Sequence, residues 1–346
     1  MSLKPTMAIL VCLSVAVLSC VKGGSPSTSL VTVKRAQMHM GTLVSITAVG
    51  RTEVETNAAI AAGFQEVKRL EQLLSTWIPN SELSRVNTAA GRSAVHVSPE
   101  TLAVVRKSLE IAEMTEGAFN VAIGPAVDAW NISAEPRLPT TEELAALKPL
   151  LDLQYVHTDL WERTIHLEKQ GMRIDVGGIG KGYAADQSVV VMKEAGALAG
   201  VVALSGDIKT FGLLPGGASF SVGIRHPRKE GAILAEIKLQ DEAISTAGDY
   251  ERFFEKDGVR YHHILDPRTL QPARGCQSVS VIAKEGIWAD GLDTGIFVLG
   301  PERGMELVEQ LEGVEAIIVD DAGRLLLSSG LRDRVVLTSD SLSREQ

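Results

Sequence analysis

A glycine-rich segment with one lysine, residues 174–186 (IDVGGIGKGYAAD), contains residue types that can hold a phosphate. Glycines allow left-handed backbone angles and let an anion approach backbone N–H groups, and a following helix N-terminus favours negative charge. A Walker A loop is excluded, because Asp175 stands where its first glycine belongs and Gly182 follows Lys181. The G-x-G-x-x-G dinucleotide fingerprint does not fit either. The alternative is a tight strand-to-helix turn in which Lys181 is only solvated.

A second segment, residues 288–300 (WADGLDTGIFVLG), carries Asp290, Asp293 and Thr294. Spacings of three and four place their oxygens on one face of a helix. Such a face suits a hard divalent ion, and Mg²⁺ prefers oxygen ligands while keeping positions open for phosphate oxygens. The alternative is acidic residues near a helix N-terminus that only complement the helix dipole.

Two adjacent histidines, His262 and His263, lie in a third segment, residues 244–273, which is rich in hydroxyl and acidic groups. On a strand they point to opposite faces, so at most one of them faces a shared site. A neutral imidazole can take the proton of a hydroxyl group. The DPRT sequence at 266–269 is a turn signature by itself.

The elements that must position these groups form an α+β pattern, without the regular βαβ alternation of a doubly wound fold. Apolar periodicity predicts helices at residues 53–75, 99–115, 140–147, 183–195, 288–299 and 301–311. Strand-like runs lie at residues 31–49, 164–167, 172–176, 200–204, 220–224, 233–239, 259–265, 278–283, 316–319 and 324–327. Short turns at 256–258 (KDG) and 321–323 (DAG) favour antiparallel hairpins. We therefore expect mixed, largely antiparallel sheets with packed helices, in a single domain from 31 to 335 followed by a polar tail, 336–346.

The N-terminus has the anatomy of a secretory signal, with an early lysine and an apolar core at residues 7–18. VLSC at 17–20 resembles the lipobox of bacterial lipoproteins, which predicts removal of residues 1–19, lipidation of Cys20 and a flexible tether at 20–30. The alternative is a plain secretion signal that ends near a cysteine. The lipoprotein interpretation places the protein on the extracytoplasmic, periplasmic side of a bacterial membrane. It leaves Cys276 without a disulfide partner. A net charge of −9 argues against nucleic acid as a partner.

Eight segments resemble, in order, the ApbE family of flavin transferases, which use FAD to attach FMN covalently to a threonine of an acceptor protein. They are MGTLVSI (40–46), STWIPNSELSRVN (75–87), GAFNVAIGPAVDAW (117–130), IDVGGIGKGYAAD (174–186), SGDIKTFG (205–212), STAGDYERFF (245–254), HHILDPRT (262–269) and ADGLDTGIFVLG (289–300). The resemblance implies a fold of the ApbE type, related to the T-fold. It also implies Mg²⁺-dependent transfer of FMN, with release of AMP, to an acceptor such as a subunit of a membrane flavin-dependent redox complex. The alternatives are an FAD pyrophosphatase that gives FMN and AMP, and a non-catalytic flavin-binding lipoprotein.

The same resemblance implies roles for individual residues. Those implied in the FAD site are Met40, Trp77, Ala118, Phe119, Asn120, Asp175, Lys181 and Ala273. Those implied in the Mg²⁺ site are the carbonyl of Gly178 together with Asp290, Asp293 and Thr294. His263 matches the family's H-I-x-D-P histidine and is the implied general base. The phosphate at the glycine-rich segment would then be the pyrophosphate of FAD.

Four positions depart from the family's pattern: Asn120 replaces the usual Asp, Ser205 a Gly, Ala247 a frequent Ser, and Leu270 a Gly. Asn120 loses a charge and Ala247 a hydroxyl, so we expect a changed acceptor choice or rate. Leu270 adopts positive φ less readily than glycine, so we expect a reshaped turn after Arg268.

Overall fold

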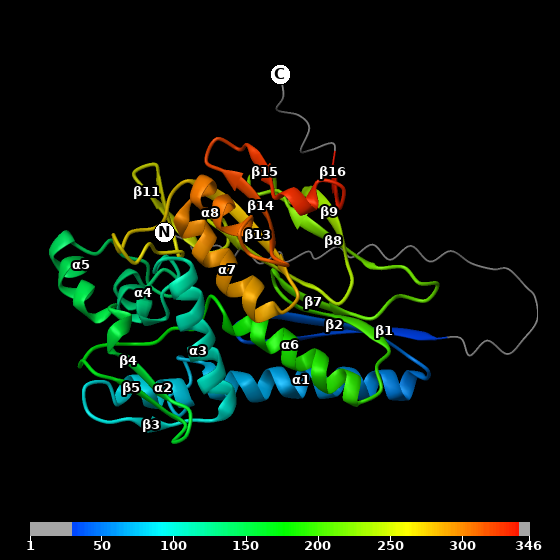
Figure 1. Cartoon of the computed structure of the whole chain (residues 1–346), viewed down its shortest axis with the longest axis horizontal. Coiled ribbons are helices and arrows are strands. Elements are labelled where there is room, and N and C mark those ends of the chain that lie inside the picture. The colour runs from blue at the N-terminus through cyan, green and yellow to red at the C-terminus, as the bar shows by residue number, and fades with distance from the viewer. Residues whose placement is uncertain (1–29, 339–346) are drawn as a thin grey trace, which may run out of the picture.

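An eight-stranded antiparallel sheet organises the computed structural model, which describes residues 30–338 (Figure 1). Its strand order is β1-β2-β6-β7-β10-β13-β14-β15. These strands are β1 Val31–His39, β2 Thr42–Gly50, β6 Ala199–Leu204, β7 Asp207–Phe211, β10 Ala243–Gly248, β13 Cys276–Ala283, β14 Glu315–Asp320 and β15 Leu325–Leu327. The signal peptide and lipidation site predicted from the sequence lie outside the described residues, as does nearly all of the tether.

Three small sheets accompany the large one. They are β16-β9-β8 (Val335–Leu337, Ile233–Leu239, Phe220–Arg225), β3-β5-β4 (Val95–His96, Thr164–Leu167, Val156–Asp159) and the hairpin β11-β12 (Phe253–Lys256, Val259–His262). Every named strand pair is antiparallel, and the KDG and DAG turns join hairpins as expected. The predicted fold class is confirmed. The predicted domain end at residue 335 falls inside β16, because Val335–Leu337 pair with β9.

The helices α1, α6 and α7 contact the large sheet and cover one of its faces (Figure 1). The helices are α1 Glu53–Leu74, α2 Glu82–Thr88, α3 Pro99–Met114, α4 Gly124–Trp130, α5 Thr141–Leu147, α6 Gly180–Glu194, α7 Gly286–Leu299 and α8 Pro301–Val308. Each predicted helix is present, although α6 begins three residues earlier than its apolar pattern indicated, inside the glycines. The first turn of α6 is therefore part of the glycine-rich segment that could bind a phosphate.

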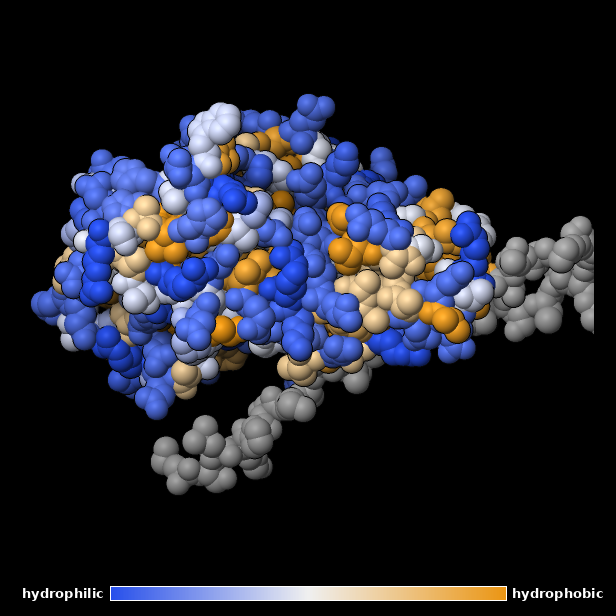
Figure 2. All heavy atoms as spheres, turned by 90° about the horizontal axis from the view of Figure 1, so that it is seen from below, coloured by the Kyte–Doolittle hydropathy of each residue, from blue (hydrophilic) through white to orange (hydrophobic). Residues whose placement is uncertain are grey.

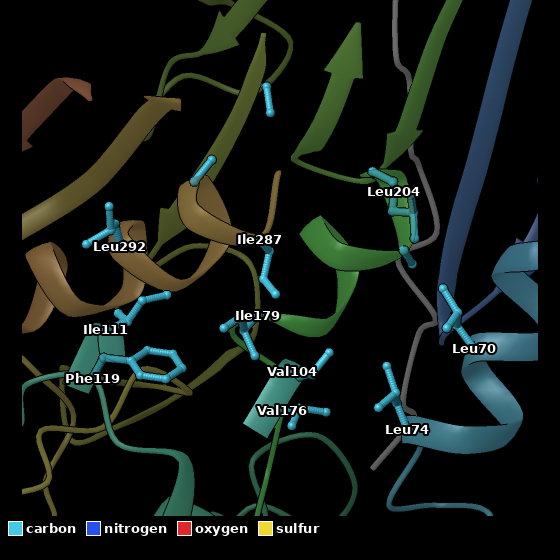
Figure 3. Packing of buried hydrophobic residues seen from close by; sticks show 14 of the residues in the cluster. Leu70, Leu74, Val104, Ile111, Phe119, Val176, Ile179, Leu204, Ile287 and Leu292 are labelled. Carbon is cyan, nitrogen blue, oxygen red and sulfur yellow. The ribbon is translucent and has the colours of Figure 1, made fainter. Parts of the chain in front are cut away.

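The main hydrophobic core lies between these helices and the sheet. Val176 and Ile179, from the segment before α6, point into it beside Val104 of α3 and Ile287 of α7 (Figure 3). A second core lies between the sheet and the β8, β9 and β16 strands. The segment that precedes α6 is therefore anchored by its apolar side chains.

The predicted strand at 172–176 is wrong, because this segment is extended but pairs with no strand. The side chain of Asn87 takes the place of a neighbouring strand: it accepts from the N–H of Ile174 at 2.7 Å and donates to its C=O at 2.9 Å. An Asn side chain presents the same donor and acceptor as a peptide group. The segment was therefore correctly predicted to be extended, but it does not belong to a sheet of residues 30–338.

Hydrophilic residues cover most of the face seen from below, with hydrophobic residues in separate groups among them (Figure 2). Between residues 30 and 338, no helix combines the length and the apolar character needed to cross a bilayer. Cys276, the one cysteine among residues 30–338, is buried, and burial raises the pKa of its thiol to about 12.

Candidate functional site

The glycine loop, residues 175–180, joins the extended segment to α6. The N–H of Asp175 donates to the carbonyl of Val121 at 2.9 Å, and its side-chain Oδ1 accepts from the N–H of Gly177 at 2.7 Å. The N–H of Gly180 donates to the carbonyl of Val176 at 2.8 Å. The loop is thus a fixed turn whose geometry is set partly by Asp175.

The loop glycines allow close contact with α7, and they are not needed for a left-handed backbone conformation. Glycines 177, 178, 180 and 182 are not among the residues with positive φ, so the expectation of left-handed angles is wrong here. A Cβ on Gly182 would lie 2.1 Å from the carbonyl oxygen of Gly286, and one on Gly178 would lie 2.9 Å from Oγ1 of Thr294. The first contact lets α6 and α7 touch, and the second brings the loop to the side chains of α7.

Asp186 fixes the start of α7 from the neighbouring helix α6. Its two carboxylate oxygens accept from the N–H groups of Gly286 at 2.8 Å and Ile287 at 3.0 Å. These N–H groups have no partner within their own helix, so the carboxylate caps α7 across a large distance in sequence. Gly182 adds a second link, because its N–H donates to Oδ2 of Asp290 at 2.7 Å. In the sequence, Asp186 is distinguished only as the last residue of a motif.

A buried cluster of three carboxylates lies at this helix pair: Asp207 at the start of β7, with Asp290 and Asp293 of α7. One oxygen from each lies within 4.8 Å of the others, and each side chain is at most 3% exposed. Ser245 of β10 donates to Asp207 and, at 2.7 Å, to Asp293. The predicted pair on α7 therefore belongs to a larger set that spans three elements.

Lys181 supplies the positive charge of this cluster. Its Nζ forms an ion pair with Asp207 and lies 4.0 Å from Oδ1 of Asp290. Thr294 lies at the edge, where its hydroxyl donates to Asp293 at 3.1 Å. The structure thus brings together the predicted residues Gly178, Lys181, Asp290, Asp293 and Thr294, and it adds Asp207 and Ser245.

The cluster holds more negative charge than its one lysine balances. Burial, together with the charge of Asp207, raises the pKa of Asp290 to about 7. Burial and the charge of Asp290 raise the pKa of Asp293 well above its usual range. Burial alone would lower the pKa of Lys181, but the charges of Asp207 and Asp290 outweigh it and raise the pKa. Three carboxylates that lie close together and offer only oxygen donors suit a hard divalent cation.

The two adjacent histidines have different surroundings. His262 is 2% exposed, its Nε2 bonds to the carbonyl of Ala273 at 2.8 Å and its Nδ1 accepts from Ile264 N–H at 3.3 Å. His263 is half-buried, and its Nδ1 contacts the carbonyl of Arg252 at 3.3 Å. A proton on Nδ1 would leave Nε2 of His263 as a free acceptor.

Burial and the positive charge of Arg252 lower the pKa of His263 well below its usual range, with a smaller contribution from Lys181. The imidazole is therefore neutral at neutral pH, which a general base requires. Both ring nitrogens of His262 are engaged, which suits a structural role.

Five more of the residues implied in the flavin site lie in four places. Phe119 faces the loop, because a Cβ on Gly178 would lie 3.5 Å from its ring, and Ala118 is buried beside it. Met40 occupies the β1–β2 turn, where its N–H donates to Oε1 of Glu71 at 2.7 Å. Trp77 follows the end of α1 and is 75% exposed. Ala273 is buried and accepts from His262.

The turn at Met40 is strained and lies at the same end of the sheet as the carboxylates. Met40 has a φ of 50°, a left-handed conformation that is costly for a residue other than glycine. The neighbouring β6–β7 turn meets β2 where the N–H of Ser205 donates to the carbonyl of Leu43 at 3.4 Å, and that turn leads directly into Asp207. Met40 is therefore linked to the cluster through two adjacent turns, whereas no hydrogen bond or ion pair links Trp77 to it within the described residues.

The four departures from the family pattern have local explanations. Asn120 caps a short 3-10 helix, accepting from Ala122 N–H at 2.8 Å, and donates to Leu151 C=O at 2.9 Å. Ser205 adopts the left-handed conformation itself, with a φ of 59°. Ala247 is buried in β10.

Leu270 also adopts the left-handed conformation, with a φ of 61°, and its side chain is fully buried. Its carbonyl accepts from Nε1 of Trp130 at 2.7 Å, and its N–H donates to Asp266 at 2.7 Å. The turn therefore keeps the conformation that a glycine would favour, and the expected reshaping is not seen. Burial of a leucine side chain contributes about 2 to 3 kcal/mol, which offsets the conformational cost of about 1 to 2 kcal/mol.

Comparisons with known proteins agree with this geometry. The profile of the ApbE family matches residues 40–318. An FAD:protein FMN transferase of Treponema pallidum (strain Nichols) is 34% identical over 346 residues, covering 95% of this chain and 94% of its own length. An FAD:protein FMN transferase of Vibrio cholerae is 32% identical over 301 residues, covering 85% and 90%.

Solved structures lead to the same family. The crystal structure of the ApbE protein from Thermotoga maritima has a TM-score of 0.80 at 30% identity, covering 87% of this chain and 98% of that one. The flavin transferase ApbE from Vibrio cholerae has a TM-score of 0.80 at 29% identity, covering 88% and 100%. The relatives share the fold over nearly their full length, so this chain belongs to the ApbE family and is a transferase.

Proposed function

We propose that this chain is an Mg²⁺-dependent FAD:protein FMN transferase that moves FMN from FAD to a threonine of an acceptor protein and releases AMP. The observation that carries the proposal is the contact between the glycine loop and α7, which sets Gly178 and Lys181 against Asp290, Asp293 and Thr294. One place then offers a lysine and the N–H of Gly178 for a pyrophosphate, and carboxylates for a divalent ion. The relatives' shared activity supports the same assignment.

The proposed reaction replaces the phosphoanhydride bond of FAD with a phosphoester bond to threonine. The threonine oxygen bonds to the FMN-side phosphorus of FAD, the bond from that phosphorus to the bridging oxygen breaks, and AMP leaves with that oxygen. His263 accepts the hydroxyl proton at Nε2, because its Nδ1 is held at the carbonyl of Arg252. Lys181 and the N–H of Gly178 orient the phosphates and offset their charge.

The residues that would hold Mg²⁺ are Asp290, Asp293 and Thr294, with the carbonyl of Gly178 beside them. The excess of buried carboxylates over cations at this point fits a divalent ion, and Asp207 lies within the same cluster. A bound ion would neutralise charge that develops on the phosphoryl oxygens. Ser245 orients Asp293 and Asp207 toward each other, and Asp186 fixes the helix that carries the ligands.

Incubation with FAD, Mg²⁺ and a flavin-acceptor domain, followed by mass spectrometry, tests the proposal. A transferase increases the mass of the acceptor by one FMN phosphoester and produces AMP. An FAD pyrophosphatase would give free FMN and AMP and leave the acceptor mass unchanged. A flavin-binding lipoprotein without activity would leave FAD intact.

Acidification should weaken the response to Mg²⁺. The folded-state pKa of Asp290 is raised to about 7, so the carboxyl is protonated below that pH and an ion must displace the proton. We expect the Mg²⁺ concentration for half-maximal thermal stabilisation to rise as the pH falls from about 8 to about 6. Differential scanning fluorimetry with Mg²⁺ titrations at each pH measures this midpoint. Equal midpoints across that range would contradict the assignment of Asp290 as a ligand.

We also propose that the protein is lipid-anchored at Cys20 on the extracytoplasmic face of a bacterial membrane, as the VLSC sequence indicates. A Cys20→Ser form should leave the membrane fraction, because it cannot receive the acyl chains that hold such proteins. Fractionation of cells that express each form, followed by immunoblotting, gives the result. A Cys20→Ser protein that stays wholly with the membranes would argue for the plain secretion signal or another attachment.

A further inference from the structure

The hairpin β11–β12 ends next to the candidate base, and within residues 30–338 no strand pairs with the outer edge of β11. Its turn, Asp257 and Gly258, has positive φ at both residues, as two-residue hairpin turns do. The N–H of His263 donates to the carbonyl of Arg252 at 3.0 Å, and pairing continues to the turn. Hydrogen-bonded and non-hydrogen-bonded pairs alternate in an antiparallel ladder. Residues 252, 254 and 256 therefore direct their backbone groups toward β12, and Phe253 and Glu255 direct theirs outward.

The two edges of the hairpin differ in how they are covered. On the β12 side, the carbonyl of Arg260 accepts from Nη2 of Arg274 at 2.9 Å. On the β11 side, the backbone N–H and C=O groups of Phe253 and Glu255 have no hydrogen-bond partner among residues 30–338. Phe253 is also 40% exposed. An open edge of this kind is a template for another strand.

This edge leads to the catalytic candidate. The carbonyl of Arg252 receives both the backbone N–H of His263, at 3.0 Å, and its Nδ1, at 3.3 Å, so the imidazole leans onto the chain of β11. A strand added to β11 would lie about 4.8 Å from β11. That strand would lie on the side of β11 opposite to β12, so the backbone of β11 would separate it from the imidazole, whose Nδ1 contacts the carbonyl of Arg252 at 3.3 Å.

We propose that β11 is the docking edge for the acceptor protein, whose extended segment around the reactive threonine adds as a strand along Phe253–Lys256. The inference deepens the proposed function and rests on it, because in that reaction the acceptor is the macromolecule that must reach His263. Arg252 has no ion-pair partner among the described residues, so a segment with a carboxylate near the threonine would complement the edge. The charged side chains of Glu255 and Lys256 disfavour unspecific strand addition here.

Proline substitution tests the edge without breaking the hairpin. Glu255→Pro removes an outward N–H, and proline is tolerated in an edge strand where the N–H faces away from the ladder. We expect the KM for the acceptor to rise about threefold to tenfold, as loss of one backbone hydrogen bond predicts, while the KM for FAD stays unchanged. Glu255→Ala is the matched control, because it also loses the contact between Glu255 and Arg260 but keeps the N–H.

Three results would overturn the inference. The first is that Glu255→Pro and Glu255→Ala have the same KM for the acceptor while the wild type transfers FMN. This result would leave the proposed function intact. The second is a dimer of the wild type that Glu255→Pro abolishes and Glu255→Ala keeps, which assigns the edge to a second copy of the chain. The third is a wild type that transfers no FMN to any acceptor, which removes the proposed function as well. Phe253→Pro, at the other outward residue, replaces Glu255→Pro if that variant melts earlier than its control.

Discussion

Replacing His263 by asparagine is expected to slow FMN transfer by roughly 10²- to 10⁴-fold while FAD affinity changes little. Nε2 of His263 is the free ring nitrogen of this neutral imidazole, whereas Nδ1 is held at Arg252. Asparagine can keep a hydrogen bond to that carbonyl but cannot take a proton from threonine. Single-turnover transfer at saturating FAD and Mg²⁺, with FAD affinity measured separately, gives both quantities.

Two other histidines serve as controls for His263. His157, an exposed residue of β4, should tolerate replacement by asparagine without a change in rate. His262→Asn should lower thermal stability, because both nitrogens of this buried ring are bonded, and should slow transfer much less than His263→Asn when both are compared as folded protein. Equal slowing by the two substitutions in stable proteins would contradict the choice of His263 as base.

The sequence predicted best those residues of the candidate site that share one helix or one loop. The spacing of Asp290, Asp293 and Thr294 determines a shared helix face wherever that helix lies. The glycine loop was likewise recognisable from its glycine-rich sequence. What neither pattern contains is the contact between α6 and α7, which depends on Gly182 meeting Gly286 across the fold.

Asp207 was not predicted, and Ser245 was predicted only as one of the hydroxyl groups of residues 244–273, because each belongs to a strand whose neighbours set its position. Both lie in segments that match the family motifs, SGDIKTFG and STAGDYERFF, yet one aspartate or serine in a strand predicts no ligand by itself. Their relation to Asp293 arises only when β7, β10 and α7 pack together. The one available signal was the position of Asp207, which begins a strand directly after the glycine of the SGDIKTFG motif.

Conformation at particular residues was also harder to predict than element type. Glycine was expected to mark left-handed backbone in the loop, whereas the left-handed residues near the site are Met40, Ser205 and Leu270. At Leu270, burial of the side chain outweighs the intrinsic preference. At residues 172–176 a side chain replaced a strand as hydrogen-bond partner. Tertiary contacts decided each case.

Replacing Asp290 by alanine is expected to nearly abolish Mg²⁺-dependent transfer, with a smaller loss of FAD affinity. The carboxylate lies in the buried cluster with Asp207 and Asp293, and its Oδ2 also accepts from the N–H of Gly182. Alanine removes a charged ligand and leaves that N–H unsatisfied, whereas asparagine can still accept from it. Excess Mg²⁺ should therefore rescue Asp290→Asn better than Asp290→Ala. Acceptor flavinylation measured against Mg²⁺ concentration separates the two variants.

Stability without Mg²⁺ provides a second readout that does not depend on turnover. Because the pKa of Asp290 is raised to about 7, its ionised form destabilises the metal-free fold as the pH rises through that value. Asp290→Asn should then be more stable than the wild type above about pH 7 without Mg²⁺, and should lose most of the stabilisation that Mg²⁺ gives. Asp320→Asn, which alters a buried carboxylate paired with Arg324, is the control and should keep the full response to Mg²⁺. If Asp290 were only a charge near a helix N-terminus, its loss would cost about 0.3 to 1 kcal/mol of stability, and full transfer by Asp290→Ala at ordinary Mg²⁺ would refute the metal site.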